Sequence, residues 1–492
     1  MQKKGLFLRK SMYAQANDIE DGHHELKKHL GAINLTTIGI GAIIGAGIFV
    51  ITGQAAAIYA GPAISISFLV AAFICLFAGL CYAELSSLIP IAGGSYSYSY
   101  VTMGEFPAWI VGWLLAAQYF FSSSTVAVGW SGYCISILND FGITLPASLS
   151  QAPLMYIPGE GWSVTGAFIN LPAVIIAAIA GTMISIGIKA AANFNNVMVV
   201  IKMCTIALFV ILGISYINTD NWTPFIPENT GIFGNFGWSG IFRGAGLVFF
   251  AYIGFDTVST LAQEAKNPQR DLPRGILGSL GICAIAYVIT ALVLTGVVSY
   301  KLLNVSDPMS VGLDALGPKL VWLKFIVKFA ILAGLSSVIL VQLLAQTRIF
   351  MAMSKDGLIP HSFSKVHPKT HTPVFSSVLT GLIAMVISGL FPIAILGQIV
   401  TMSTLLIFAI VCLGVLILRY THPDQKRPFK VPFSPYVPAA GILCCLGLIS
   451  FLPMMTWLQV MIWLVFGMAI YFAYSRHHSK LRREHGLEPN HK

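Results

Sequence analysis

The chain has 492 residues, of which 56% are hydrophobic and only 10% are charged, and its formal net charge is +10. A typical soluble domain carries about a quarter charged residues, so this composition excludes a chain that covers its cores with polar surface. The surplus of apolar side chains is expected to face a lipid bilayer, whose core is spanned by apolar runs of about 20 residues. The Lys and Arg residues lie between the apolar runs, which favours an orientation signal over nucleic-acid binding.

Continuous apolar runs predict twelve transmembrane helices. In chain order they cover residues 33–58, 62–89, 107–135, 171–189, 195–217, 240–263, 275–298, 322–354, 374–390, 394–418, 434–453 and 456–475. No apolar core lies within the first 30 residues, so we expect no cleavable signal peptide. An even number of spans predicts that both termini lie on the same side of the membrane.

The positions of the basic residues predict the orientation of these spans. With both termini in the cytoplasm, 23 of the 29 Lys and Arg residues lie on the cytoplasmic side, and the long loops 136–170 and 218–237 contain none. This distribution obeys the positive-inside rule and predicts a multi-pass protein of the cell inner membrane. The ends, 1–30 and 476–492, are expected to be charged cytoplasmic tails without a fold of their own.

The sequence predicts neither a cofactor nor a metal. Its eight cysteines lie within apolar runs, without the spacing of metal ligands, and are expected to be small reduced hydrophobic side chains. There is no phosphate-binding Walker loop, which disfavours an ATP-driven pump.

Glycines interrupt two spans that lie five spans apart. The first span reads Gly39–Phe49 around Gly45-Ala46-Gly47, and the sixth reads Phe249–Asp256 around Gly254. A repeat unit with an odd number of spans inserts with opposite topology, so an inverted pair of five-helix repeats is expected. The predicted divisions are the first repeat 31–218, the second repeat 238–420 and two additional helices within 431–475.

Such interruptions predict a binding site made of backbone. Unwinding frees N–H and C=O groups at bilayer depth, which is tolerated only where these groups line a cavity or meet a ligand. The N-terminus of a half-helix suits a carboxylate, and free carbonyls suit an ammonium group. Two opposed breaks can therefore bind the zwitterionic head of an amino acid. The alternative is that the spacing of Gly41 and Gly45 only allows close helix packing.

Eight segments, in order along the chain, resemble one family. They are Gly39–Phe49, Tyr82–Leu85, Gly93–Tyr96, Phe250–Asp256, Glu264–Arg270, Gln346–Arg348, Met353–Gly357 and Arg427–Pro432. On these motifs the chain resembles the amino acid–polyamine–organocation (APC) superfamily, and within it the bacterial relatives of cationic amino acid transporters. The resemblance implies an all-α membrane protein with the LeuT-type fold, which consists of a 5+5 inverted repeat and two extra C-terminal helices.

The resemblance also implies the substrate-binding residues. It assigns the substrate carboxylate and main chain to four residues of the first break: Ile43, Gly45, Ala46 and Gly47. It assigns the amine and side chain to Phe250, Ala251 and Ile253, with Phe250 as a gate. Ordinary helix packing is the alternative role for Phe250.

Lys202 is expected to couple transport to protons. A lysine well inside a membrane helix is costly and indicates function, although a side chain that reaches back to the membrane surface is an alternative. In the family pattern its ammonium resembles a built-in cation in place of sodium, with carbonyls of the first break and the hydroxyls of Ser336 or Ser337 as partners. Asp256 is interpreted either as a proton relay or as a helix cap.

Two glutamines complete the predicted site. Gln118 stands where some bacterial relatives carry a glutamate, which weakens the case for a cationic substrate and for a proton carrier on the third helix. Gln342 resembles a position that shapes side-chain selectivity, and a helix–helix hydrogen bond is its alternative role. Outside the site, Arg243, Lys324 and Lys328 form an external basic set that either attracts anionic substrates or meets lipid headgroups.

These features predict a secondary transporter that imports amino acids by proton symport without sodium, through alternating access. Small neutral amino acids are favoured slightly over cationic and branched ones as substrates. The expected partners are the amino acid, a proton and the lipid bilayer, with no nucleic acid, and the sequence carries no indication of oligomeric state. An amino acid or polyamine exchanger on the same fold is the first alternative, and a membrane nutrient sensor is a distant one.

Overall fold

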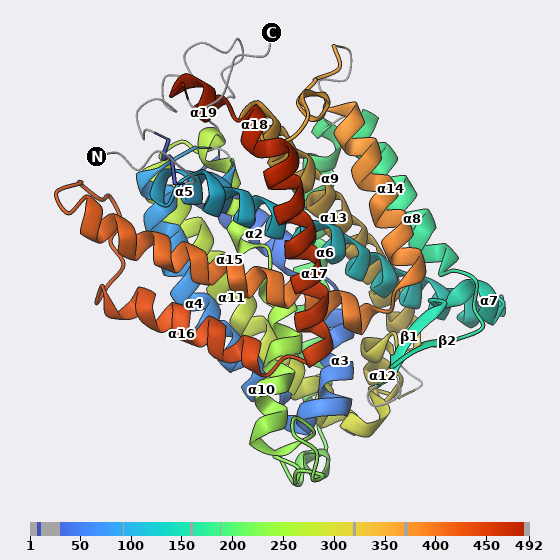
Figure 1. Cartoon of the computed structure of the whole chain (residues 1–492). Helices are drawn as coiled ribbons and strands as arrows, with labels where there is room; N and C mark the ends of the chain where they lie inside the picture. Colours follow the sequence, from blue (N-terminus) through green and yellow to red (C-terminus); the bar gives the residue numbers. More distant parts are fainter. Residues whose placement is uncertain are drawn as a thin grey trace.

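The computed structural model describes residues 7–10, 30–91, 93–157, 161–186, 188–317, 321–368 and 372–486. Figure 1 shows long helices packed side by side, with α19 (Lys480–Glu484) at the top of the view and α10 (Gly237–Val248) at the bottom. The helices follow from long apolar runs, because a helix satisfies all its backbone groups internally and can bury apolar side chains on every face.

The first half of the chain is helical apart from one hairpin. Its elements are α2 (Ala32–Ile43), η1 (Gly47–Ile51), α3 (Thr52–Ala55), η2 (Ala56–Ala60), η3 (Gly61–Ala63), α4 (Ile64–Leu88), α5 (Gly94–Thr102), α6 (Glu105–Asp140), α7 (Ala147–Ser150), β1 (Leu154–Ile157), β2 (Gly161–Val164), α8 (Leu171–Ile186), α9 (Ile188–Ile214) and η4 (Thr219–Trp222).

The second half begins with α10 and repeats the pattern of a broken helix followed by long helices. Its further elements are η5 (Phe249–Tyr252), η6 (Phe255–Glu264), α11 (Pro268–Val297), η7 (Tyr300–Leu302), α12 (Pro308–Asp314), α13 (Val321–Lys355), η9 (His361–Phe363), α14 (Val374–Leu390), α15 (Ile393–Thr421), α16 (Tyr436–Ser450), α17 (Met454–Ile470), η10 (Tyr471–Ser475), α18 (Arg476–His478) and α19.

Each predicted apolar run coincides with helical structure. In the part of the chain that the structure describes, eight helical segments are long and apolar enough to cross a membrane, and four shorter apolar helices, α2, α8, α14 and α16, accompany them. Large apolar side chains point outward along α8, where Ile175 and Ile179 are 46% and 50% exposed. Because such a surface is unfavourable in water, the bundle fits a lipid environment.

Helices from the two halves pack extensively against one another. The pairs include α4 with α11, α6 with α13, and α8 with α14, and α15 also packs along α6. These contacts bury the core between the halves, so neither half is an independent globular unit.

The structure differs from the expected all-α architecture in the loop 136–170. This loop contains an antiparallel hairpin, in which Leu154 pairs with Val164 and Ile157 pairs with Gly161. Strands of four residues carry too few alternating positions to stand out in a sequence. The short helices α5, α7 and α12 were also not predicted, because none of them forms a long apolar run.

The described parts of both chain ends are ordered by contacts with the bundle. Residues 480–484 form α19, and within it Leu481 and Arg482 are only 8% and 4% exposed. Residues 7–10 also lie against the bundle, where the carbonyl of Leu8 accepts a hydrogen bond from the N–H of Glu105 at 2.9 Å. Buried carboxylates that bind basic residues of the two ends account for this order.

Two lysines of the external basic set are neutralised by carboxylates. Lys324 lies 2.8 Å from Asp314 and 3.6 Å from Asp140, and Lys328 forms an ion pair with Asp140. Arg243 donates to the carbonyl of Phe233 at 3.0 Å. The idea that the two lysines attract anionic substrates is therefore wrong, because their charge already joins the end of α6 to the start of α13.

Glu84 binds the loop between α15 and α16. Its carboxylate accepts hydrogen bonds from Arg419 Nε at 3.0 Å, Arg419 Nη2 at 2.5 Å and the N–H of Val431 at 2.7 Å, and Arg427 Nε lies 3.3 Å away. This buried carboxylate therefore fixes the loop between α15 and α16 to the end of α4. Glu264, by contrast, lies only loosely opposite Arg348, at 3.9 Å.

Replacing Glu84 by alanine is expected to destabilise the protein by about 3–5 kcal/mol, because it leaves the buried charge of Arg427 without a carboxylate. The apparent melting temperature of the purified protein measures this effect. Glu228→Ala is the matched control, since Glu228 is exposed in a loop. Equal melting temperatures for the two variants would contradict the assigned role of Glu84.

Candidate functional site

The first break separates α2 from η1. Helix α2 ends at Ile43, Ile44 takes an extended conformation with ψ of 104°, and helical structure resumes at Gly47. The last carbonyls of α2 and the first N–H groups after the break therefore lack partners within the helix. The structure confirms the predicted interruption around Gly45.

The second break lies at Ile253 and Gly254. Ile253 is extended with ψ of 128°, and Gly254 has φ of 134°, a region that favours glycine. Helical structure on either side, in η5 and η6, is of the tighter 3₁₀ type. An interruption was predicted here as well, and the structure confirms it.

The two breaks touch each other. A Cβ added to Gly47 would lie 2.3 Å from Cβ of Ala251, and one added to Gly254 would lie 2.7 Å from the carbonyl of Ala42. Both glycines are therefore required by close backbone approach, whereas a Cβ on Gly45 would meet only Val338, at 3.5 Å. The predicted substrate residues of the first break thus lie directly against Ala251 of the second.

Tyr287 of α11 joins the breaks through one hydroxyl. Its O–H lies 3.0 Å from the carbonyl oxygen of Ile43 and 3.0 Å from that of Ala251. The residue is fully buried, so the phenol satisfies backbone groups that unwinding has freed. The sequence analysis missed Tyr287. A phenol within an apolar run was a usable signal, because a buried tyrosine O–H usually has a hydrogen-bond partner.

Lys202 of α9 points into the bundle and binds the end of α2. Its Nζ donates to the carbonyl of Gly41 at 2.9 Å, and the side chain is fully buried. This placement excludes a side chain that reaches back to the membrane surface, and it confirms the expected carbonyl partner. A Cβ on Gly334 of α13 would lie 2.9 Å from Cγ of Lys202, so this glycine, which the sequence analysis missed, makes room for the lysine.

The expected pairing of Lys202 with Ser336 or Ser337 is wrong. Ser336 donates to the carbonyl of Leu332 at 2.9 Å, and Ser337 donates to that of Gly334 at 2.8 Å. Each hydroxyl thus donates within α13, as serines in apolar helices commonly do, and that of Ser336 also accepts from Trp130 Nε1 of α6 at 3.0 Å. The described partner of the lysine is instead the Gly41 carbonyl in the last turn of α2.

Gln118 and Asp256, predicted for different roles, lie together. Gln118 Nε2 donates to Asp256 Oδ2 at 3.2 Å, and both side chains are buried. The other oxygen of each side chain, Gln118 Oε1 and Asp256 Oδ1, has no hydrogen-bond partner among the described residues. Asp256 stands near the start of η6, where a carboxylate is favoured by the helix dipole.

The remaining predicted residues surround the breaks. Phe250 and Ile253 are buried at 5% and 3% exposure, and Ala46 is fully buried beside them in the same core. Gln342 of α13 is 3% exposed, and its Oε1 has no partner among the described residues. The hydrogen bond between helices that was the alternative role of Gln342 is therefore not made by this oxygen.

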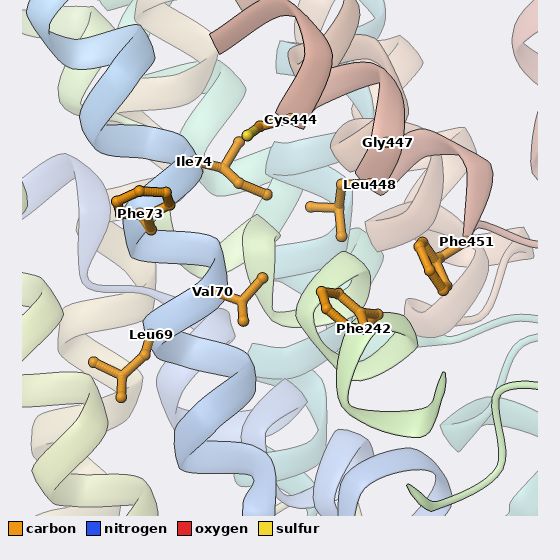
Figure 2. Close-up of a pocket in the computed structure, with 9 residues that line it drawn as sticks. All are labelled: Leu69, Val70, Phe73, Ile74, Phe242, Cys444, Gly447, Leu448 and Phe451. Carbon is orange, nitrogen blue, oxygen red and sulfur yellow. The ribbon is translucent and has the colours of Figure 1, made fainter. Parts of the chain in front are cut away.

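An apolar groove with an empty volume of about 900 Å³ lies away from the two breaks. Figure 2 shows its lining from α4, α10 and α16, which consists of Leu69, Val70, Phe73, Ile74, Phe242, Cys444, Gly447, Leu448 and Phe451. These residues offer no side-chain charge or hydrogen-bonding oxygen or nitrogen, so the groove suits apolar chains and contributes nothing to the predicted site.

Comparison with known proteins places this architecture in a family. A family model described as "Amino acid permease" matches residues 30–475. The chain is 44% identical over 458 residues to the methylthioribose transporter of Bacillus subtilis (strain 168), covering 93% of this chain and 95% of that protein. It is 42% identical over 483 residues to the branched-chain amino acid permease BcaP of the same organism, covering 98% and 100%.

A plant relative extends the comparison. The chain is 37% identical over 405 residues to "Cationic amino acid transporter 4, vacuolar" of Arabidopsis thaliana, covering 82% of this chain and 65% of that protein. These relatives are transporters rather than enzymes, and the apolar helices agree with a multi-pass membrane protein. The chain therefore belongs to the amino acid permease family of the APC superfamily, as a relative of the cationic amino acid transporters.

Proposed function

We propose that this protein imports small neutral amino acids by sodium-independent proton symport, through alternating access around the two breaks. The observation that carries the proposal is the contact between the breaks at Gly47 and Ala251, with freed backbone groups on both sides. Permeases and cationic transporters among the relatives support amino acid transport.

The breaks offer complementary groups to a zwitterion. N–H groups at the start of the segment that begins at Gly47 suit a carboxylate, because a helix N-terminus carries a partial positive charge. Carbonyls at the end of η5 suit an ammonium group. An α-amino acid carries both groups at a fixed separation, so backbone alone recognises its head, and the side chain is left to Phe250, Ile253 and Gln342.

Lys202 supplies the positive charge that sodium provides in sodium-coupled transporters. Its ammonium binds the Gly41 carbonyl at 2.9 Å, two residues before the first break. Loss of the proton weakens this hydrogen bond and removes the charge, which loosens the end of α2. Protonation of Lys202 is thereby linked to the geometry of the substrate site.

Asp256 is the second titratable group near the breaks. The amide of Gln118 donates to it at 3.2 Å and thereby takes the place of a cationic partner. A neutral glutamine cannot exchange a proton or balance a cationic substrate, which supports a neutral side chain on the substrate. It also leaves Asp256 and Lys202 as the candidate proton carriers.

The membrane arrangement completes the proposal. Twelve spans in a 5+5 inverted repeat with two further helices are supported by the packing of α4 on α11, α6 on α13 and α8 on α14, which join equivalent places in the two halves. Both termini lie in the cytoplasm, since this orientation places the basic loops on the cytoplasmic side, as the positive-inside rule requires. Exchange on the same fold is the second candidate, favoured by the neutral Gln118 in place of an acid.

The test is uptake into proteoliposomes. Thermal stabilisation against the twenty amino acids and methylthioribose first selects the substrate, because a bound ligand raises apparent stability. An inward proton gradient without sodium is expected to drive accumulation, and Lys202→Ala is expected to reduce the initial rate by about tenfold or more. Lys301→Ala, at an exposed loop position, is the control.

Two outcomes would overturn parts of this scheme. Unchanged proton-driven uptake in Lys202→Ala would remove Lys202 from the mechanism. Counterflow of substrate at full rate without any gradient, combined with no accumulation under a gradient, would replace symport by exchange.

Glycine variants test the contact between the breaks. Gly47→Ala is expected to lower the uptake rate by about tenfold or more, because the new methyl would lie 2.3 Å from Ala251 and push the breaks apart. Gly281→Ala in α11 is the matched control, because its methyl would meet nothing within 4 Å. Equal loss of uptake in both variants would show that the loss does not come from the contact between the breaks.

A further inference from the structure

Both described chain ends dock at the same end of the bundle. We propose that residues 7–10 and 478–484 form a releasable strap that holds α5 against η6 and so keeps this end of the path to Asp256 closed. The contacts that the strap makes do not depend on the transport mechanism. Their role in opening and closing the path to Asp256 rests on the proposed function.

The C-terminal part of the strap is fixed by Glu105, the first residue of α6. The carboxylate is fully buried and accepts hydrogen bonds from Arg482 Nε at 2.8 Å, from Tyr471 O–H at 2.9 Å and from the hydroxyl of Ser479. Ser479 also caps α19 by accepting from the N–H of Arg482 at 3.3 Å. One carboxylate thus orders the whole turn that follows α18.

The N-terminal part is fixed by Asp356, at the end of α13. Lys10 forms an ion pair with Asp356, and its Nζ lies 5.0 Å from the centre of the Tyr100 ring. A Cβ on Gly104 would lie 2.6 Å from the backbone of Phe7, so the peptide runs directly over this glycine. The two parts of the strap also meet at one residue, because the N–H of Lys480 donates to the carbonyl of Asp356 at 3.1 Å.

Helix α5 lies between the strap carboxylates and the second break. On one face, Tyr96 O–H donates to Asp356 Oδ2 at 2.7 Å and Tyr100 O–H donates to Glu105 Oε2 at 3.1 Å. These tyrosines are four residues apart and therefore share a helix face. At its start, a Cβ on Gly94 would lie 3.1 Å from Ser259 of η6. The carboxylates that bind the strap therefore also bind the helix that covers η6.

The covered side contains a narrow cleft beside Asp256. Its empty volume is about 160 Å³, and it leaves no room for a water molecule. Its lining comes from α5 and the turn before it, from α6, η6 and α13: Gly93, Gly94, Ser95, Leu115, Tyr119, Asp256, Ser259, Thr260 and Ile349. As long as α5 stays in place, water and protons cannot reach Asp256 through this cleft.

The strap is built to detach more easily than the helices. It contributes few apolar anchors, chiefly Leu8 and Leu481, and the rest of its contacts are polar or ionic. Segments with few buried apolar contacts open at lower free energy than the core to which they bind. Undocking removes the positive charges from Glu105 and Asp356, and it frees α5 to move away from η6.

Hydrogen exchange measured by mass spectrometry on the purified full-length protein tests the strap. Lys10→Ala and Arg482→Ala are expected to raise amide exchange in residues 94–102 and 255–264 by about tenfold, with no change in α14. Arg9→Ala and Lys480→Ala are matched controls, because these side chains are exposed neighbours with no ion pair in the described structure. Raising salt from about 0.1 M to about 1 M on the unaltered protein gives a second route to release of residues 7–10, because the partly exposed Lys10–Asp356 pair is screened by salt, whereas the buried Arg482–Glu105 pair is screened much less.

The segments in which amide exchange becomes faster decide the outcome of the test. Faster exchange in residues 478–484 with unchanged exchange in α5 and η6 would overturn the proposal, because the strap would then be released without effect. Faster exchange throughout the bundle would also overturn it, since that is the result of general destabilisation. Neither readout requires transport, so failure of the proposed function would leave this test intact.

Discussion

The structure depends on one close contact at bilayer depth, where the backbone at Gly47 meets Ala251. Two helices lose their hydrogen bonding within the apolar core, which is costly unless the freed groups find partners. The Tyr287 hydroxyl, 3.0 Å from the carbonyls of Ile43 and Ala251, and Lys202, 2.9 Å from that of Gly41, supply those partners. Side chains from α9 and α11 thus bind three carbonyls at or next to the breaks, two of which share the one Tyr287 hydroxyl.

Around this contact, the continuous helices α6 and α13 are fixed at their ends by ion pairs, in contrast to the two interrupted helices. Helices α6 and α13 pack along their length and are joined at one end by Asp140 with Lys324 and Lys328. At the other end, Glu105 and Asp356 hold the two chain ends. Carboxylates therefore brace both ends of this pair. Among the described residues, the interrupted helices carry no such ion pairs near their breaks, which suits segments that rearrange during transport.

The sequence predicted the features that depend on local chemistry. Glycine positions predicted both breaks, the cost of a membrane lysine favoured an inward-pointing Lys202, and the family resemblance implied its carbonyl partner. What depends on three-dimensional packing was missed or wrong. The place of Gly334 beside Lys202 follows from how α9 crosses α13, which spacing along the chain does not encode. The pairing of Gln118 with Asp256 joins residues far apart in sequence. The serines of α13 were assigned to Lys202 by analogy, but their own helix satisfies them.

The central claim is that backbone groups at the two breaks bind the head of an amino acid. Calorimetric titration of the purified protein with its best substrate, the α-carboxamide of that substrate and its N-acetyl form tests this claim directly. Loss of either charged group is expected to weaken binding by at least about 100-fold, because a buried site built for hydrogen bonds rejects ligands that leave its groups unpaired. Binding of both analogues within about threefold of the parent amino acid would contradict the account.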